Sequence, residues 1–210
     1  MPHGAESNGK ILMESVSFED MRRAMVDSQL RTNGVTQAWV LAAMGSVPRE
    51  DYVPVSHHNV CYTDRAIPLD DGTVLNPPLA TALLLQAADI QATDKVLLIG
   101  ASEAGAQGYV AALLRARVAG LTSASTANWA DAGHAAPYDV IFIDGAAHLV
   151  PDALLALAEE GARLVTGIAD GPVTRLAKGY IHQGQVALKA FIDSEIAPLA
   201  AFARKPEFTF

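Results

Sequence analysis

Three continuously apolar segments stand out in the second half of the chain. They read KVLLIG, YDVIFIDGA and ARLVTGI, at residues 95–100, 138–146 and 162–168. A strand that is apolar at consecutive positions is buried on both faces, as strands of a parallel sheet are. Helical patterns up to Arg115 and over residues 151–159 separate the three segments. The alternation predicts a doubly wound α/β sheet with right-handed crossovers.

Weaker signals complete the expected sheet. A short strand is predicted over residues 118–121, and Gly161 is expected to end the helix over residues 151–159. After Gly171 the pattern changes to two strands around a glycine-containing turn, in VTRLAKGYIHQGQVALKAF. We therefore expect a mostly parallel sheet that ends in antiparallel strands.

Helical patterns prevail in the N-terminal part. A capping box that begins at Ser17 predicts a helix to about residue 31, and Thr36 is expected to cap a second helix. A third helix is predicted from Asn76 to about residue 88, with two prolines in its first turn. These patterns predict a single domain over residues 17–210, with an N-terminal helical cap (17–75) and an α/β core (76–210). Residues 1–16 are expected to be a disordered tail.

Composition and charge narrow the function classes. The chain has 210 residues, half of them hydrophobic, and a net charge of −8 without an extended basic cluster, so we expect no nucleic-acid partner. Its apolar runs are too short to span a bilayer, and its start resembles no secretion signal. One cysteine, Cys61, excludes an internal disulfide and fits a reducing, cytoplasmic location.

Candidate chemistry gathers at the carboxyl ends of the predicted strands, where ligands bind in such sheets. Residues 100–105, 122–126 and 144–148 are expected to converge there. The strand, small-residue loop and helix in VLLIGASEAGAQGYVAALL have the shape of a nucleotide-binding unit. The candidate cofactor-binding residues are Gly100, Ala101, Ser102, Ala104, Gly105 and Thr122.

Other polar residues leave alternatives open. Asp144 follows an apolar run and is either a base or ligand contact in a cleft, or a cap of the next turn. Arg49 and Glu50 form either a structural ion pair or a contact of the substrate region. His57, His58 and Cys61 lack the spacing of a zinc site, so no metal is expected.

Four segments resemble protein-L-isoaspartate O-methyltransferases. The N-terminal one is MVDSQLRTNGVTQAWVLAAMGSVPREDYVP, and CYTDRAIPL follows it. APYDVIFIDGAAHLVPDALLALAEEGARLV resembles the late strand–helix–strand unit of the family, and APLAAF resembles a C-terminal strand. The resemblance extends over about residues 21–202.

The resemblance implies a class I methyltransferase fold. It also implies S-adenosylmethionine as methyl donor and the side-chain carboxylate of isoaspartyl residues in peptides or proteins as acceptor. The methyl ester then collapses to a succinimide, which repairs the backbone. Because the acceptor is already a nucleophile and the donor is already activated, such catalysis is mainly alignment.

Two motifs depart from the family. GTVLNPP stands where the family has Thr-Ile-Ser-x-Pro with an active-site serine, so Thr73 matches the threonine and Leu75 replaces the serine, which removes a hydrogen-bonding group. Thr73, Leu75, Asn76 and Asp144 are the candidate catalytic residues. In the glycine-rich motif, Leu98 stands at the family's glutamate, and the second and third glycines are displaced. A shifted alignment places Gly108-Tyr109 on the family's Gly-Tyr.

A third departure concerns the second strand of the predicted sheet. It ends VAGLTSAST without the acidic residue that grips the ribose, and 14 residues separate Ser123 from Tyr138. That linker is too short for a helix and an extra strand, so we predict that one strand and its helix are missing. Three hypotheses follow: an isoaspartyl methyltransferase with impaired activity, a silent binding or scaffold protein that forms homo-oligomers, and a changed ligand held by Asp144 and the turn over residues 100–105.

Overall fold

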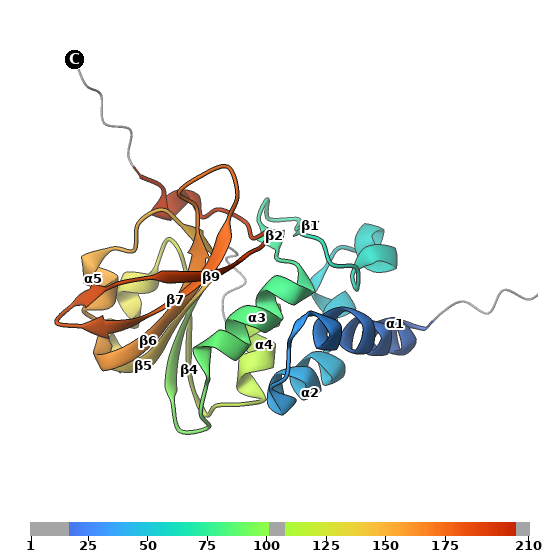
Figure 1. The fold of residues 1–210 in the computed structure, drawn as a ribbon, viewed down its shortest axis with the longest axis horizontal. Coiled ribbons are helices and arrows are strands. Elements are labelled where there is room, and N and C mark those ends of the chain that lie inside the picture. Colours follow the sequence, from blue (N-terminus) through green and yellow to red (C-terminus); the bar gives the residue numbers. More distant parts are fainter. Residues whose placement is uncertain (1–16, 101–107, 205–210) are drawn as a thin grey trace, which may run out of the picture.

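A computed structural model describes residues 17–100 and 108–204, which form an α/β fold around one large sheet (Figure 1). The strand order is β4-β3-β5-β6-β7-β8, and β9 also pairs with β7. The parallel strands are β3 (Lys95–Gly100), β4 (Gly120–Ser125), β5 (Tyr138–Ala147) and β6 (Ala158–Ile168). The antiparallel strands are β7 (Arg175–His182), β8 (Gln185–Val186) and β9 (Lys189–Asp193). The predicted fold class is confirmed.

Strand β3, which lies between β4 and β5, shows why its sequence is apolar from Val96 to Ile99. Val96 and Leu98 belong to one apolar cluster, which also contains residues of the N-terminal helices. Leu97 and Ile99 belong to a second cluster on the other face. Since successive side chains of a strand point to opposite faces, both faces of β3 are covered and no position favours a polar residue.

The first helix starts and ends as predicted. Helix α1 (Phe18–Ala24) continues as a π-helical turn, η1 (Met25–Leu30), and a 3-10 turn, η2 (Arg31–Asn33). The Ser17 Oγ accepts a hydrogen bond from the Asp20 amide at 3.1 Å. The chain leaves the last turn at Gly34 with φ +86°, a conformation that glycine adopts without strain.

The cap predicted for the second helix is wrong. Helix α2 (Ala38–Ser46) begins after Gln37, and the Thr36 side chain does not cap it. Instead the Gln86 Oε1 of helix α3 (Pro78–Ala88) accepts from the Thr36 amide at 2.7 Å and from the Gln37 amide at 3.1 Å. Gln86 also donates to the Gly34 carbonyl. The amides are satisfied across a tertiary contact, which local spacing does not reveal.

The remaining elements surround the sheet. On the face that carries α2 and α3, the described chain forms η3 (Arg49–Tyr52), η4 (Val55–Val60), the hairpin β1 (Ile67–Pro68) and β2 (Val74–Leu75), and α4 (Tyr109–Arg115). Figure 1 shows the N-terminal helices beside α3 and α4. Residues of η6 (Trp129–Ala135) and α5 (Asp152–Leu155) join the apolar cluster of the opposite face.

Three predicted elements have different bounds or a different form. The strand predicted over residues 118–121 is β4, at 120–125. The helix predicted over 151–159 is only the short α5, because β6 begins at residue 158 and bulges around Gly161, whose φ is +82°. APLAAF makes one parallel bridge, between Ala146 and Pro198, followed by the 3-10 turn η7 (Ala200–Phe202), and is not a strand.

Strand β4 is an edge of the sheet, as the short linker predicts. The chain between β4 and β5 contains one 3-10 helix, η6, and no strand among its residues, all of which are described. The order of the sheet therefore begins at β4, with β3 as its neighbour. The strand and helix that were expected to be missing are absent, which leaves the end of β4 without a further strand beside it.

In the described ranges 17–100 and 108–204, no helix is long and apolar enough to cross a membrane.

Candidate functional site

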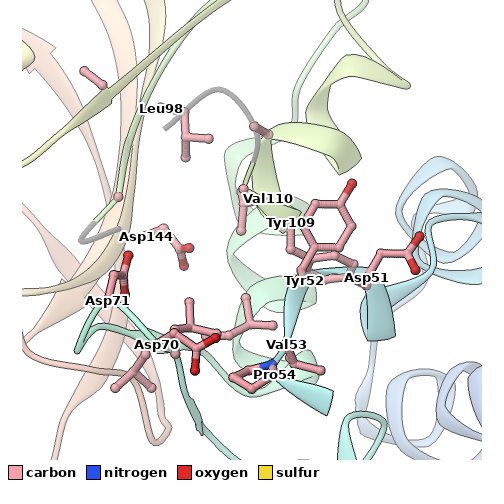
Figure 2. A pocket seen from close by; sticks show the side chains of 17 residues that line it. Asp51, Tyr52, Val53, Pro54, Asp70, Asp71, Leu98, Tyr109, Val110 and Asp144 are labelled. Carbon is pink, nitrogen blue, oxygen red and sulfur yellow. The ribbon is translucent and has the colours of Figure 1, made fainter. Parts of the chain in front are cut away.

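A cavity of about 440 Å³ opens at the carboxyl ends of β3, β4 and β5. Residues from six parts of the chain line it. Its described lining includes Asp51 and Tyr52 of η3, Asp70, Asp71 and Leu75 of the β1–β2 hairpin, Leu98 and Gly100 of β3, Tyr109 of α4, Ala124 of β4 and Asp144 of β5. Figure 2 shows the Asp144 carboxylate directed into this cavity, with Asp70 and Asp71 on the hairpin nearby. One described residue of each segment that was predicted to converge, namely Gly100, Ala124 and Asp144, lines this cavity.

Asn76 holds three segments together beneath the cavity. Its side chain is 1% exposed. The Nδ2 donates to the Asp144 Oδ1 at 2.8 Å, and the Oδ1 accepts from the Ala197 amide at 2.8 Å. Its main-chain carbonyl accepts from the Arg49 Nη2 at 2.7 Å. Asn76 thus positions Asp144 and leaves none of its own side-chain oxygen or nitrogen unused.

Arg49 is a fully buried cation behind the cavity wall. It is 0% exposed, and its Nε donates to the Cys61 carbonyl at 2.7 Å. The guanidinium carbon lies 5.1 Å from the centre of the Tyr109 ring. Its Nη1 is buried without a hydrogen-bond partner in the described structure. Burial lowers the pKa of Arg49, which is expected of a charge removed from water.

Glu50 resolves one alternative that the sequence leaves open. It pairs with Arg22 at 2.8 Å and not with Arg49, and the Tyr62 hydroxyl donates to its other carboxylate oxygen. The Tyr62 hydroxyl also accepts from the Arg49 amide at 3.1 Å. Glu50 is therefore the structural partner of helix α1, whereas Arg49 is bonded to the Cys61 and Asn76 carbonyls behind the cavity wall.

Electrostatics in the cavity are dominated by carboxyl groups. Asp51, Asp70, Asp71 and Asp144 line it, and none of its described lining residues is Lys, Arg or His. Burial raises the pKa of Asp144, while the hydrogen bond from Asn76 and the charge of Arg49 oppose that rise. Burial also raises the pKa of Tyr109 to about 12. The described residues contain no group of three or more metal-ligating side chains placed to hold an ion.

The candidate site residues do not all reach the cavity. Leu75, Gly100 and Asp144 line it, and Asn76 supports it. Thr73 does not line it; its amide instead donates to the Asp71 Oδ1 at 2.9 Å. Thr122 pairs with Leu97 in the middle of β4 and is not a lining residue. The candidates Ala101, Ser102, Ala104 and Gly105 lie outside the described residues.

Sequence reasoning missed most of the cavity's polar wall. Asp51 and Tyr52 lie inside the N-terminal motif that resembles the family, but nothing in their spacing indicates that they line a cavity. Asp70 and Asp71 lie in an irregular segment between two very short strands, where periodicity gives no orientation. Asn76 was identified only by its place in the motif, since its side chain does not cap α3 and instead bonds Asp144 and the Ala197 amide.

Comparison with known proteins shows that this chain is similar to members of one protein family. The family model described as protein-L-isoaspartate(D-aspartate) O-methyltransferase matches residues 21–125. A protein-L-isoaspartate O-methyltransferase of Koribacter versatilis (strain Ellin345) is 30% identical over 203 residues, which cover 85% of this chain and 90% of the relative.

Solved structures support the same fold. One, named protein-L-isoaspartate O-methyltransferase, superposes with a TM-score of 0.64 at 17% identity over 87% of this chain and 65% of that chain. Another, assigned as a protein-L-isoaspartate O-methyltransferase of Plasmodium falciparum in complex with S-adenosyl-L-homocysteine, has a TM-score of 0.65 at 13% identity. That match covers 86% of this chain and 98% of the other.

Proposed function

The chain belongs to the protein-L-isoaspartate O-methyltransferase family, and from this membership we propose that it binds S-adenosylmethionine in the cavity and methylates isoaspartyl carboxylates with reduced activity. The observation that carries the proposal is the cavity itself. It lies at the carboxyl ends of β3 and β5, the usual place for a ligand in an open α/β sheet, and is joined there by the N-terminal segments.

The cavity fits part of the cofactor. Its volume of about 440 Å³ lies within the usual range for small-molecule sites. S-adenosylmethionine carries a sulfonium and an ammonium group, which suit a wall of carboxylates. The fit is poorer at β4, where Ala124 reaches the cavity without a polar group and the Ser125 Oγ is hydrogen-bonded to Asn128 at 3.1 Å. An absent charge-assisted bond to a ribose weakens binding by roughly 1.5–3 kcal/mol.

The residues of the site would act by binding and alignment. S-adenosylmethionine, when bound, supplies the activated methyl group. Tyr52 and Tyr109, whose ring centres lie 5.5 Å apart, line the cavity with Leu75 and Leu98 and would give the bound groups an apolar wall. Leu75, 6% exposed, cannot donate a hydrogen bond to an acceptor. Loss of such a bond lowers the rate and leaves the chemistry intact, which is why we propose impaired activity.

The test is calorimetric titration with S-adenosylmethionine and S-adenosylhomocysteine, followed by radiolabelled methyl transfer to an isoaspartyl peptide. We expect binding in the high-micromolar range and slow transfer. Leu75→Ser should raise the transfer rate, and Leu79→Ser, on α3 outside the cavity lining, is the matched control. A folded protein that binds neither ligand up to millimolar concentration would overturn the proposal.

A second candidate is a silent family member that acts through binding and forms homo-oligomers. Its support is the pair Leu75 and Leu98, both of which put apolar side chains into the cavity. It differs in outcome from the first: the protein would bind S-adenosylhomocysteine weakly or not at all, and the Leu75→Ser variant would transfer no methyl group to the isoaspartyl peptide.

A further inference from the structure

We propose that Asp144 carries a proton when the acceptor binds and donates it in a hydrogen bond to the acceptor carboxylate. This inference rests on the proposed function and names the residue that selects the acceptor. The cavity would then take an anion despite its acidic wall, because the carboxyl nearest its floor is neutral. Asp144 would be an acceptor-binding residue, and its proton would not be transferred in the reaction.

The shortage of hydrogen-bond donors is the first argument. A carboxylate removed from water needs donors, and leaving it without them is costly. Among the described lining residues, the side chains able to donate are the hydroxyls of Tyr52 and Tyr109 and any carboxyl that is protonated. Asn76, the nearest amide, already gives its Nδ2 to Asp144. A protonated Asp144 supplies a hydrogen-bond donor, which the leucine at position 75 cannot supply.

The placement of Asp144 is the second argument. Asn76 fixes its Oδ1 from beneath, at 2.8 Å, so that the carboxyl is oriented before any ligand enters. Figure 2 shows the group directed into the cavity between the hairpin and α4. A carboxyl with one oxygen accepting a hydrogen bond and the other protonated has the arrangement of a preorganised donor.

The surroundings of Asp144 are the third argument. The titratable and charged groups of the elements packed around Asp144 are Arg49, Asp51 and Tyr52 of η3, Asp70 and Asp71 of the hairpin, and Tyr109 of α4. Arg49 opposes protonation, and burial favours it. When the acceptor carboxylate lies within hydrogen-bond distance of Asp144, ionising both groups is costly because their negative charges repel each other. The entry of an acceptor therefore keeps the proton on Asp144.

The reaction balances without any proton movement. An acceptor carboxylate oxygen forms the new bond to the methyl carbon as the carbon–sulfur bond breaks, and the sulfur keeps that electron pair. The negative charge of the acceptor disappears in the ester. Asp144 keeps its proton throughout and is ready for the next acceptor.

The experiment measures acceptor binding apart from turnover. A rhodamine-labelled isoaspartyl peptide, with its termini blocked and no other titrating side chain, is titrated with the protein by fluorescence anisotropy from pH 5 to 9. Each titration is made with and without saturating S-adenosylhomocysteine. Above the pKa of Asp144, affinity should fall by about tenfold per pH unit, because only the protonated fraction binds.

Variants separate this role from a structural one. Asp144→Asn keeps the bond to Asn76 and a donor, and should bind the peptide at every pH with the affinity that the wild type shows at low pH. Asp144→Ser should also bind without a pH dependence, and Asp144→Ala should bind at least tenfold more weakly than the wild type at low pH. Asp51→Asn, at the exposed mouth, should strengthen binding and leave the slope unchanged.

Two results would overturn the inference. One is peptide affinity that is constant or rises with pH in the wild type. The other is an Asp144→Asn variant that binds as weakly as Asp144→Ala. Failure of the proposed function has a different signature, because it appears as absent binding of S-adenosylhomocysteine in calorimetry, whatever the peptide does.

Discussion

The two sides of the cavity are built very differently. On one side, η3, the β1–β2 hairpin and β5 are tied together by hydrogen bonds through Arg49 and Asn76. On the other, β4 ends at the sheet edge with Ala124 as its contribution to the wall. The first side includes residues of the N-terminal motifs that resemble the family, and the second side lies next to the short linker between β4 and β5. A fold can therefore keep one half of its site fully braced while the other half loses an element.

The largest expected effect is a loss of stability when the hydrogen bonds of Asn76 on the braced side are removed. Asn76→Ala removes two buried side-chain bonds and leaves the Ala197 amide without its partner. We expect a loss of about 2–3 kcal/mol in the free energy of unfolding, measured by urea denaturation. Asn33→Ala is the control, because Asn33 is exposed and its side chain bonds only within its own turn. Equal losses in the two variants would mean that the bracing contributes little.

The next effect tests the β4 side. Ala124→Asp places a carboxylate at the cavity wall, where it can accept from ribose hydroxyls. We expect S-adenosylhomocysteine affinity to rise about tenfold, equivalent to about 1.4 kcal/mol, as measured by calorimetry. Thr122→Asp, two residues earlier on the same face and outside the lining, should leave affinity unchanged. An unchanged affinity in Ala124→Asp would indicate that no ribose reaches this edge.

A smaller effect concerns the pH dependence of stability on the braced side. Burial raises the pKa of Asp144 above its ordinary 3.8, so the native state binds more protons than the unfolded chain. Stability contributed by this group is therefore present at low pH and falls as pH rises through the native pKa. Asp144→Asn should remove that decline, so the urea midpoints of the two proteins should diverge as the pH rises above 3.8. Parallel curves would contradict a raised pKa.

The smallest expected effect is on the pH dependence of stability at Glu160, a residue outside the cavity lining that serves as a reference. Glu160 accepts from the Gln183 amide at 3.0 Å and contacts His182, and these bonds lower its pKa below 4.5. Its contribution is present above pH 4.5 and is lost as pH falls through the lower, native pKa. Glu160→Gln should slightly reduce the acid-side decline in melting temperature. Glu159→Gln, the exposed neighbour, should leave the decline unchanged.

Elements with long apolar runs were predictable, and elements fixed by tertiary contacts were not. Strands β3 and β5 follow directly from continuous burial. The helix over residues 151–159 was wrongly extended because Leu154 and Leu155 fit a helical stripe, while the strand that follows depends on pairing with β5. Asp144 and Leu75 were identified from motifs. The bracing of Asp144 by Asn76 joins residues 68 positions apart, which no local pattern encodes.

Gln86 has a consequence for the order in which the chain acquires structure during its synthesis. The two amides immediately before α2, those of Thr36 and Gln37, donate to a side chain 50 and 49 positions further along. On the ribosome, α2 therefore emerges as an incompletely capped, short segment, and short isolated helices are marginal in water. It gains its final hydrogen bonds only once α3 has also left the exit tunnel, so the two helices mature as one unit in the nascent protein.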